Sequence, residues 1–287
     1  MKINAHAKIN LGLDVIGKRD DGYHEVRMIM QTIELHDELT IERIDEPQIF
    51  IMTDRDDLSV GKDNLIHKAS KLLMDEYDLP GGIKVQLKKN IPVAAGLAGG
   101  STDAAATMIA VNELFGLGLS RDELMKRGVR IGADVPYCIM GGTALSEGIG
   151  EILTPIGPCP EWRTLIAKPP VSVSTAHVYQ SLRPEKVKHP DIDMIAEGIA
   201  QKDLHKVVSN MGNVLESVTM SEVSDIGEIK KIMADRGYPL MSGSGPTVFG
   251  LFETDDAINR TYEDLKKTGL VEDLVITRIY DPDRQVN

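Results

Sequence analysis

The chain opens with strict alternation of apolar and polar side chains. Odd-numbered positions from 3 to 15 carry Ile, Ala, Leu or Val, whereas even-numbered positions from 2 to 10 carry Lys, Asn or His. Side chains alternate between the two faces of a strand, so this pattern predicts a strand over 2–15 with one face in a core. Lys8 and Asn10 then project from the same face, one pleat apart. A second strand region over 25–44, reached through the charged turn GKRDDG at 17–22, predicts a long hairpin.

Helical periodicity governs much of the remaining chain. Asn64 is placed to cap a helix over 65–77, and Ser120 with Glu123 has the spacing of a capping box for a helix that ends near residue 130. Further helices are expected from about 175 and over 192–200, 204–218, 223–236 and 256–268, and strands over 83–88, 143–146, 162–168 and 275–280. Three prolines and a glycine in 155–160 predict a domain boundary, which divides the chain into 1–155 and 156–287.

Composition narrows the class of protein. The 287 residues include 44 acidic and 32 basic side chains, a net charge of −12 that argues against nucleic acid or an anionic membrane as a partner. Cys138 and Cys159 lack CxxC spacing, so we expect reduced thiols rather than a disulfide or a zinc site. The start MKINAHAKIN lacks the apolar core of a signal peptide, and no apolar run approaches the roughly 20 residues that cross a bilayer. We therefore expect a soluble cytoplasmic protein, as a monomer or weak homodimer.

One glycine-rich stretch stands out, PVAAGLAGGSTDAAA at 92–106, between a predicted strand and an alanine-rich helical pattern. A glycine loop that opens a helix presents backbone N–H groups and the positive end of the helix dipole, which is an arrangement that binds phosphate. The alternative is a sharp turn with an alanine helix packed closely behind it, and composition alone does not separate the two. The P-loop sequence GxxxxGK[ST], GxGxxG, HExxH and GxSxG are all absent.

Three stretches resemble motifs of the GHMP kinases, the family of galactokinase, homoserine kinase and mevalonate kinase. Residues 7–13 resemble the first motif, 92–106 the second, and SGSGPTVFG at 242–250 the third. The stretches AKINLGLDV, DGYHEV and GADVP resemble the members of this family that act on a cytidyl diphosphate. The motifs occur in the family's order and the resemblance runs over the whole chain. One departure is Ala98, where many members carry glycine; this suggests that position 98 does not need a positive φ.

The resemblance implies an α+β, two-domain GHMP kinase fold. Its N-terminal part would be a ribosomal-protein-S5-domain-2-like nucleotide domain, and its C-terminal part a ferredoxin-like α/β sandwich that binds substrate. The implied reaction is transfer of the ATP γ-phosphoryl to the 2-hydroxyl of 4-diphosphocytidyl-2-C-methyl-D-erythritol, in the non-mevalonate isoprenoid route. The implied ATP-binding residues are Ala94, Ala95, Gly96, Leu97, Ala98, Gly99, Gly100, Ser101, Thr102, Asp103 and Ala104. Mg²⁺ is implied as well; the sequence assigns no ligands, although Ser101 or Thr102 is placed to reach it.

The resemblance also assigns roles to single residues. Asp134 in GADVP is the implied general base, although an Asp before Val-Pro is also an ordinary helix N-cap. Lys8 is the implied partner cation, although on its own it reads as a solvated lysine of a strand face. The implied acceptor-binding residues are Asn10, Tyr23, His24, Thr175 and Tyr179, with both tyrosines as stacking walls for the cytosine. Residues 242–246 are expected to abut the phosphate loop. The remaining side chains Lys2, His6 and Asp14 on the face of Lys8 are expected to be solvated.

Two alternatives remain at this point. The first is another small-molecule kinase of the same family, such as a homoserine kinase; Tyr23, His24 and Tyr179 argue against it, because a base-stacking site is of no use to a small acceptor. The second is a sensor that binds ligand without turnover, against which the presence of both Lys8 and Asp134 argues.

Overall fold

The computed structural model describes residues 1–20 and 22–282, so Asp21 of the predicted turn and residues 283–287 lie outside the described part. The chain forms two compact units. Unit 1 comprises Met1–Ala7, Leu35–Val93 and Ala98–Met140; unit 2 comprises Lys8–Glu34, Ala94–Leu97 and Gly141–Asn287. This grouping differs from the predicted division at residue 155. The physical reason is the length of the first hairpin: strands β1 (Lys2–Lys18) and β2 (His24–Ile44) each contribute residues to both units.

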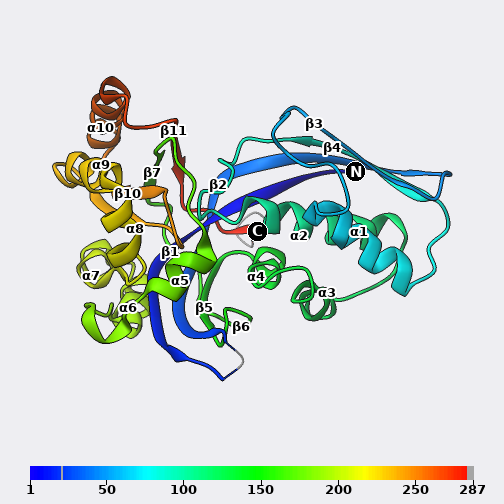
Figure 1. Ribbon diagram of the computed structural model, residues 1–287, viewed down its shortest axis with the longest axis horizontal. Coiled ribbons are helices and arrows are strands. Elements are labelled where there is room, and N and C mark those ends of the chain that lie inside the picture. Colours follow the sequence, from blue (N-terminus) through cyan, green and yellow to red (C-terminus); the bar gives the residue numbers. More distant parts are fainter. Residues whose placement is uncertain (21, 283–287) are drawn as a thin grey trace. The chain divides into compact units, whose positions relative to one another are not determined.

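Unit 1 is built on a sheet with helices on one face. β4 (Gly82–Lys88) pairs antiparallel with β2 and parallel with β3 (Ile49–Thr53), an edge strand that the sequence pattern did not predict. Figure 1 shows α1 and α2 side by side against these strands. The helices of this unit are α1 (Leu65–Glu76), α2 (Gly99–Leu114), α3 (Arg121–Gly128) and α4 (Val135–Met140).

The helix starts in unit 1 follow the predicted capping chemistry. The Asn64 side chain accepts the N–H of Ile66 at the start of α1. Ser120 and Glu123 form the complete capping box of α3. Alanines at 104, 105, 106 and 110 on α2 are buried, which lets the helix pack closely in the core of the unit. The local sequence therefore determines where these helices begin.

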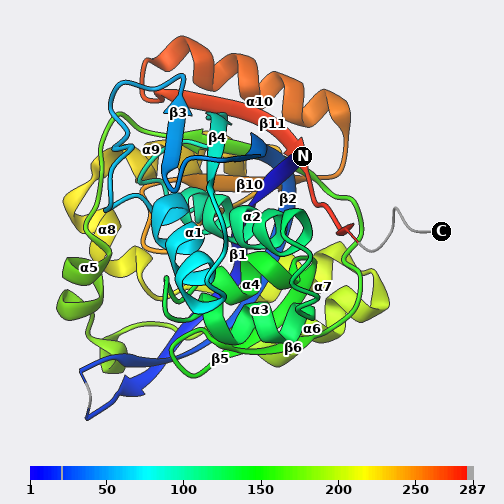
Figure 2. The same cartoon turned by 90° about the vertical axis from the view of Figure 1, so that its right-hand side faces the viewer.

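Unit 2 contains a four-stranded antiparallel sheet in the order β11–β7–β10–β9. Its strands are β7 (Arg163–Lys168), β9 (Tyr238–Met241), β10 (Val248–Phe252) and β11 (Asp273–Arg278). Helices α9 (Ser224–Ala234) and α10 (Asp255–Thr268) pack against this sheet, and Figure 2 shows α10 running beside β11. Every residue of β10 is buried, as expected for a central strand that is covered by helices.

Unit 2 also contains part of the first hairpin, and β5 (Thr143–Glu147) and β8 (Gly212–Asn213) pair with that part. β5 pairs with β2 and with β6 (Ile152–Pro155), a second strand that was not predicted. The remaining elements are α5 (Thr175–Ser181), the 3₁₀ turn Pro184–Lys186, α6 (Ile192–Gln201), α7 (Leu204–Asn210) and α8 (Glu216–Glu222). The α+β class is confirmed. No helix within the described residues is long and apolar enough to cross a membrane.

The single helix predicted over 204–218 is wrong. The chain forms α7 and α8, separated by β8, which pairs with Gly12 and Leu13 of β1 in parallel register. Gly212 weakens the helix at the break, and Asn213 bonds its own backbone two residues on, since its Oδ1 accepts the N–H of Leu215 at 3.0 Å. The pairing of β8 with β1 therefore interrupts a helical pattern of apolar residues that the local sequence would continue as one helix.

Candidate functional site

Lys8 and Asn10 lie next to each other on β1, as the alternation predicts. Lys8 Nζ donates to Asn10 Oδ1 at 2.9 Å and to the carbonyl oxygen of Gly96 at 3.3 Å. Lys8 is 5% exposed and Asn10 is fully buried, so the reading of Lys8 as a solvated surface lysine is wrong. A buried ammonium is costly unless polar groups surround it. The two contacts join the first predicted motif to the second.

The SGSG turn after β9 meets the same two residues. Gly243 N–H donates to Asn10 Oδ1 at 3.1 Å, and Ser242 Oγ donates to the Gly96 carbonyl at 3.0 Å. The approach is close: a Cβ added at Gly96, where φ is +73°, would lie 2.3 Å from the Ser242 carbonyl oxygen. Only glycine fits such a position. The expected contact between the turn and the glycine-rich segment is therefore confirmed at Gly96.

Asn213 anchors this turn, and sequence reasoning missed it. Its side-chain amide donates to the carbonyl oxygens of Met241 at 2.8 Å and Gly243 at 2.7 Å. Asn213 is 6% exposed and sits on β8. The amide therefore holds the residue before the turn and Gly243, whose N–H donates to Asn10. The only sequence signal was the Gly-Asn pair inside an otherwise helical pattern.

Two of the predicted acceptor-binding residues, His24 and Tyr179, lie together in unit 2. His24 and Tyr179 have ring centroids 5.4 Å apart, tilted by 40°, whereas Tyr23 is 60% exposed at the end of the hairpin. Partial burial, with a smaller effect from Lys18, lowers the pKa of His24 and favours the neutral ring. The Thr175 hydroxyl lies 2.8 Å from Ser244 Oγ, which links α5 to the SGSG turn.

The glycine-rich segment contains two alanines in the left-handed region. Ala94 has φ +51° and Ala98 has φ +59°. The expectation that position 98 does not need a positive φ is wrong: the residue before α2 takes this conformation although it carries a Cβ. A left-handed alanine costs about 1 kcal/mol, so the segment holds local strain of the kind found at binding loops.

The two hydroxyls after the glycines differ in their surroundings. Thr102 Oγ1 donates to the His6 carbonyl at 2.7 Å and is buried, which directs it into unit 1. Ser101 is half-buried, and a Cβ added at Gly132 would lie 3.9 Å from its Oγ. Ser101 therefore sits beside the predicted GADVP motif and is the better placed of the two to meet a ligand.

Asp134 directly precedes α4, and its carbonyl accepts the N–H of Cys138 at 3.0 Å, as at a helix start. The side chain belongs to unit 1 and is half-buried. Lys8 belongs to unit 2, so the pairing of these two residues stays a prediction. No group of three or more His, Cys, Asp or Glu within residues 1–20 and 22–282 is arranged to hold a metal ion.

Asp14 and His6 were expected to be solvated, and the structure corrects this. Both are half-buried. Asp14 Oδ1 lies 2.6 Å from His189 Nδ1, and this contact, opposed by slight burial, raises the pKa of His189. The His6 ring lies 5.0 Å from the His36 ring within unit 1. Position 2 alone of these three remains exposed.

Comparison of the chain with known proteins identifies its family. Residues 64–142 match the model described as GHMP kinases N terminal domain, and 195–270 match that described as GHMP kinases C terminal. The 4-diphosphocytidyl-2-C-methyl-D-erythritol kinase of Lachnoclostridium phytofermentans is 50% identical over 284 residues, which cover 98% of each chain. The enzyme of the same name from Lachnospira eligens is 51% identical over 98% of this chain and 99% of its own.

Solved structures agree with the sequence relatives. A crystal structure of 4-(cytidine 5'-diphospho)-2C-methyl-D-erythritol kinase superimposes with a TM-score of 0.84 at 30% identity, covering 98% of this chain and all of the other. Homoserine kinase from Cytophaga hutchinsonii shares the fold, with a TM-score of 0.78 at 20% identity over 97% of this chain and 94% of its own. The motifs, the fold and the full-length relatives agree, and the chain belongs to the GHMP kinase family.

Proposed function

We propose that this chain transfers the γ-phosphoryl of ATP to the 2-hydroxyl of 4-diphosphocytidyl-2-C-methyl-D-erythritol, a step of the non-mevalonate isoprenoid route. The observation that carries the proposal is the meeting of three motifs at Lys8. Its ammonium contacts Asn10 of the first motif and Gly96 of the second, and Asn10 accepts the N–H of Gly243 from the third. Relatives about half identical over nearly the whole chain, named for this substrate, support the choice of acceptor.

In the proposed reaction the acceptor hydroxyl oxygen forms a bond to the γ-phosphorus. The bond from that phosphorus to the β–γ bridging oxygen breaks, and ADP leaves with the electron pair. Asp134 takes the hydroxyl proton as general base. Lys8, oriented by Asn10 and Gly96, stabilises the charge on the transferring group. Such transfers depend on positioning and electrostatics more than on covalent catalysis.

Acceptor choice is proposed to lie at the end of the hairpin. The ring pair of His24 and Tyr179, with the exposed ring of Tyr23 nearby in sequence, offers aromatic faces to a cytosine. Stacking on such rings is worth about 1–3 kcal/mol per base. Thr175 adds a hydroxyl on α5. A small acceptor such as homoserine has no group that would use these rings.

The glycine-rich segment is the proposed site of the triphosphate. Residues 94–104 supply backbone N–H groups at the start of α2, a 16-residue helix. Because the described residues contain no cluster of metal-binding side chains, Mg²⁺ would be held mainly by ATP oxygens and water, with the Ser101 hydroxyl as the protein group closest to this role. The enzyme is expected to act in the cytoplasm, as a monomer or weak homodimer.

The test uses an acceptor panel and one catalytic variant. The wild-type protein should phosphorylate the cytidyl substrate and leave homoserine unchanged, whereas turnover of homoserine alone would favour the rival kinase. Asp134→Asn should lower kcat by about 10²–10⁴-fold with ATP binding retained. Asp122→Asn, an exposed Asp in the first turn of α3, is the matched control and should keep normal turnover. ATP binding without transfer in the wild-type protein would favour the sensor.

A further inference from the structure

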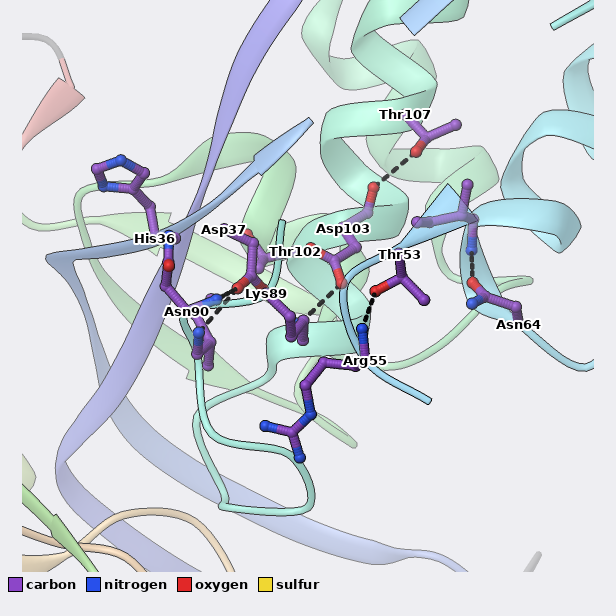
Figure 3. Close-up of polar contacts among 12 residues, drawn as sticks. His36, Asp37, Thr53, Arg55, Asn64, Lys89, Asn90, Thr102, Asp103 and Thr107 are labelled. Carbon is purple, nitrogen blue, oxygen red and sulfur yellow. Dashed lines mark hydrogen bonds and ion pairs between the residues drawn. The ribbon is translucent and has the colours of Figure 1, made fainter. Parts of the chain in front are cut away.

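A buried ion cluster lies in unit 1 at the two ends of the glycine-rich segment. Lys89 Nζ lies 2.8 Å from Asp103 Oδ2 on α2 and also pairs with Asp37 Oδ2 on β2 (Figure 3). The side chains of Lys89, Asp37 and Asp103 are 4%, 0% and 5% exposed. Neither the predicted chemistry nor the proposed reaction uses this lysine or Asp37. The pairing of Lys89 with Asp37 and Asp103 therefore has no assigned role, although Asp103 itself is among the implied ATP-binding residues.

Asp37 holds the backbone at the N-terminal end of the segment. Its Oδ1 accepts the N–H groups of Asn90 at 2.6 Å and Ile91 at 2.8 Å, the two residues before Pro92. The Asn90 amide donates to the His36 carbonyl at 2.9 Å, and the N–H of Lys89 donates to Asp54 Oδ1 at 3.0 Å. Side chains from outside the segment thus fix each residue from 89 to 91.

Asp103 holds the other end. It lies in the second turn of α2, thirteen residues after Asn90, and its carboxylate binds the same ammonium as Asp37. Lys89 also packs on the first residue of this helix: a Cβ added at Gly99 would lie 3.0 Å from its Nζ. One ammonium therefore ties the approach to the loop to the helix that follows it.

The contact of Lys89 with Asp37 and Asp103 depends on the charge of each of the three groups. Two carboxylates face one ammonium, and Asp103 Oδ1 is buried with no hydrogen-bond partner among the described residues. Burial raises the pKa of Asp103 to about 7; Lys89 opposes this rise and Asp37 adds to it. Burial also lowers the pKa of Lys89, but its attraction to Asp103 and Asp37 is stronger and leaves that pKa raised. Apolar side chains of similar size often stabilise a fold as well as buried ions do, so fold stability alone does not explain the cluster.

We propose that Lys89, Asp37 and Asp103 form a clasp that fixes the two ends of the glycine-rich segment, and that they are positioning residues for ATP. The segment between these ends includes two left-handed alanines, and strained backbone persists only where its surroundings hold it. Loose ends would let the N–H groups relax away from the geometry that a triphosphate needs, and binding would then carry the cost of ordering them. The inference rests on the proposed function, in which this segment binds ATP.

The test compares ATP binding with folding in full-length variants. Lys89→Met and the double variant Lys89→Met/Asp103→Leu remove the ammonium, and the double variant also removes the carboxylate that would be left without it on α2. Asp37→Asn keeps an oxygen for the N–H groups of Asn90 and Ile91. Lys88→Met is the matched control, because the neighbouring Lys88 is exposed and pairs with exposed Glu38. The readouts are the Kd for ATP by titration calorimetry, kcat at saturating ATP, and the unfolding temperature.

The clasp predicts that the folded Lys89 variants bind ATP about tenfold or more weakly, and that the single variant Lys89→Met keeps a kcat at saturating ATP close to the wild-type value. Asp37→Asn should give a smaller effect in the same direction, and Lys88→Met none. A double variant that is folded and binds ATP with the wild-type Kd would overturn the clasp, even if it melts earlier. If Lys89→Met alone does not fold, the double variant decides. Wild-type protein that fails to bind ATP would instead refute the proposed function.

Discussion

Two buried lysines have contrasting partners. Lys8 in unit 2 donates to the amide oxygen of Asn10 and the carbonyl oxygen of Gly96, which are neutral acceptors. Lys89 in unit 1 pairs with the carboxylates of Asp37 and Asp103. Lys8 is 5% exposed as a residue, and the Lys89 side chain is 4% exposed. The contacts of Lys8 join the first and second motifs, whereas those of Lys89 join the residues before the glycine-rich segment to the helix after it. The location of these contacts in the chain, more than burial, therefore separates a lysine proposed to meet a phosphoryl group from one proposed to hold a loop.

The largest expected effect separates the two lysines by kinetics. Lys8→Met should lower kcat by about 10²–10³-fold, because it removes a charge that acts in the transition state, with the Kd for ATP changed little. Lys89→Met should show the reverse pattern. Steady-state kinetics and calorimetry on both variants check this, with exposed Lys2→Met as the control for Lys8. A loss of kcat in both variants, with equal ATP binding, would show that the two lysines do not have separate roles.

The next largest effect is expected at Asn213, which holds the turn whose Gly243 N–H donates to Asn10, the neighbour of Lys8. Asn213→Ala removes three side-chain hydrogen bonds, and leaves the carbonyls of Met241 and Gly243 without this donor and the Leu215 N–H without this acceptor. We expect a loss of about 2–4 kcal/mol in the free energy of unfolding, together with a lower kcat because the turn that binds Asn10 loosens. Urea unfolding monitored by circular dichroism measures the first quantity. Unchanged stability would show that the amide is not what fixes the turn.

Stability should also depend on pH through Asp103. Its pKa is about 7 in the folded protein, against 3.8 for an ordinary Asp, with burial as the main cause and Lys89 and Asp37 facing it. The folded state therefore holds a proton that the unfolded state has released, so this contribution is present at low pH and is lost as pH rises from about 4 to about 7. Denaturation of wild type and Asp103→Asn at pH 5 and pH 8 should show a smaller decline in the variant. Equal declines would contradict the assignment.

The smallest expected effect tests strain in the loop. Ala98→Gly should raise the free energy of unfolding by about 0.5–1 kcal/mol, because glycine takes a φ of +59° without a steric cost. The matched control is Ala95→Gly. Ala95 is a buried neighbour that is not among the residues with positive φ, so glycine there should destabilise the protein instead. Destabilisation by both changes would show that the left-handed alanine is not strained.

Local sequence patterns predicted much of the fold, because strand alternation and helix capping depend on residues that are close together in the chain. Alternation predicted β1 and the shared face of Lys8 and Asn10, and capping chemistry predicted the starts of α1 and α3. The burial of Lys8 was not predicted by pattern, because polar side chains on a strand face are usually solvated and the covering turn comes from more than 230 residues later.

The parts that failed depend on long-range contacts. Asn213 fell inside an apolar period that reads as helix, and only its pairing with β1 reveals a strand. The cluster of Lys89, Asp37 and Asp103 joins three segments that carry no common motif. Ala98 was misjudged because the sequence contains no trace of the tertiary contacts that hold a strained φ. Local sequence could not identify Asn213 or the pairing of Lys89 with Asp37, because the partners of these residues come from distant parts of the chain.

Identification of the atom that receives phosphate is the decisive test of the proposed kinase reaction. The purified protein is incubated with ATP, Mg²⁺ and 4-diphosphocytidyl-2-C-methyl-D-erythritol, and the product is analysed by ³¹P and ¹³C NMR. We expect coupling between the new phosphorus and carbon 2 of the erythritol moiety, with one ADP formed for each product molecule. A phosphate on any other oxygen, or ADP formation without an acceptor product, would contradict it.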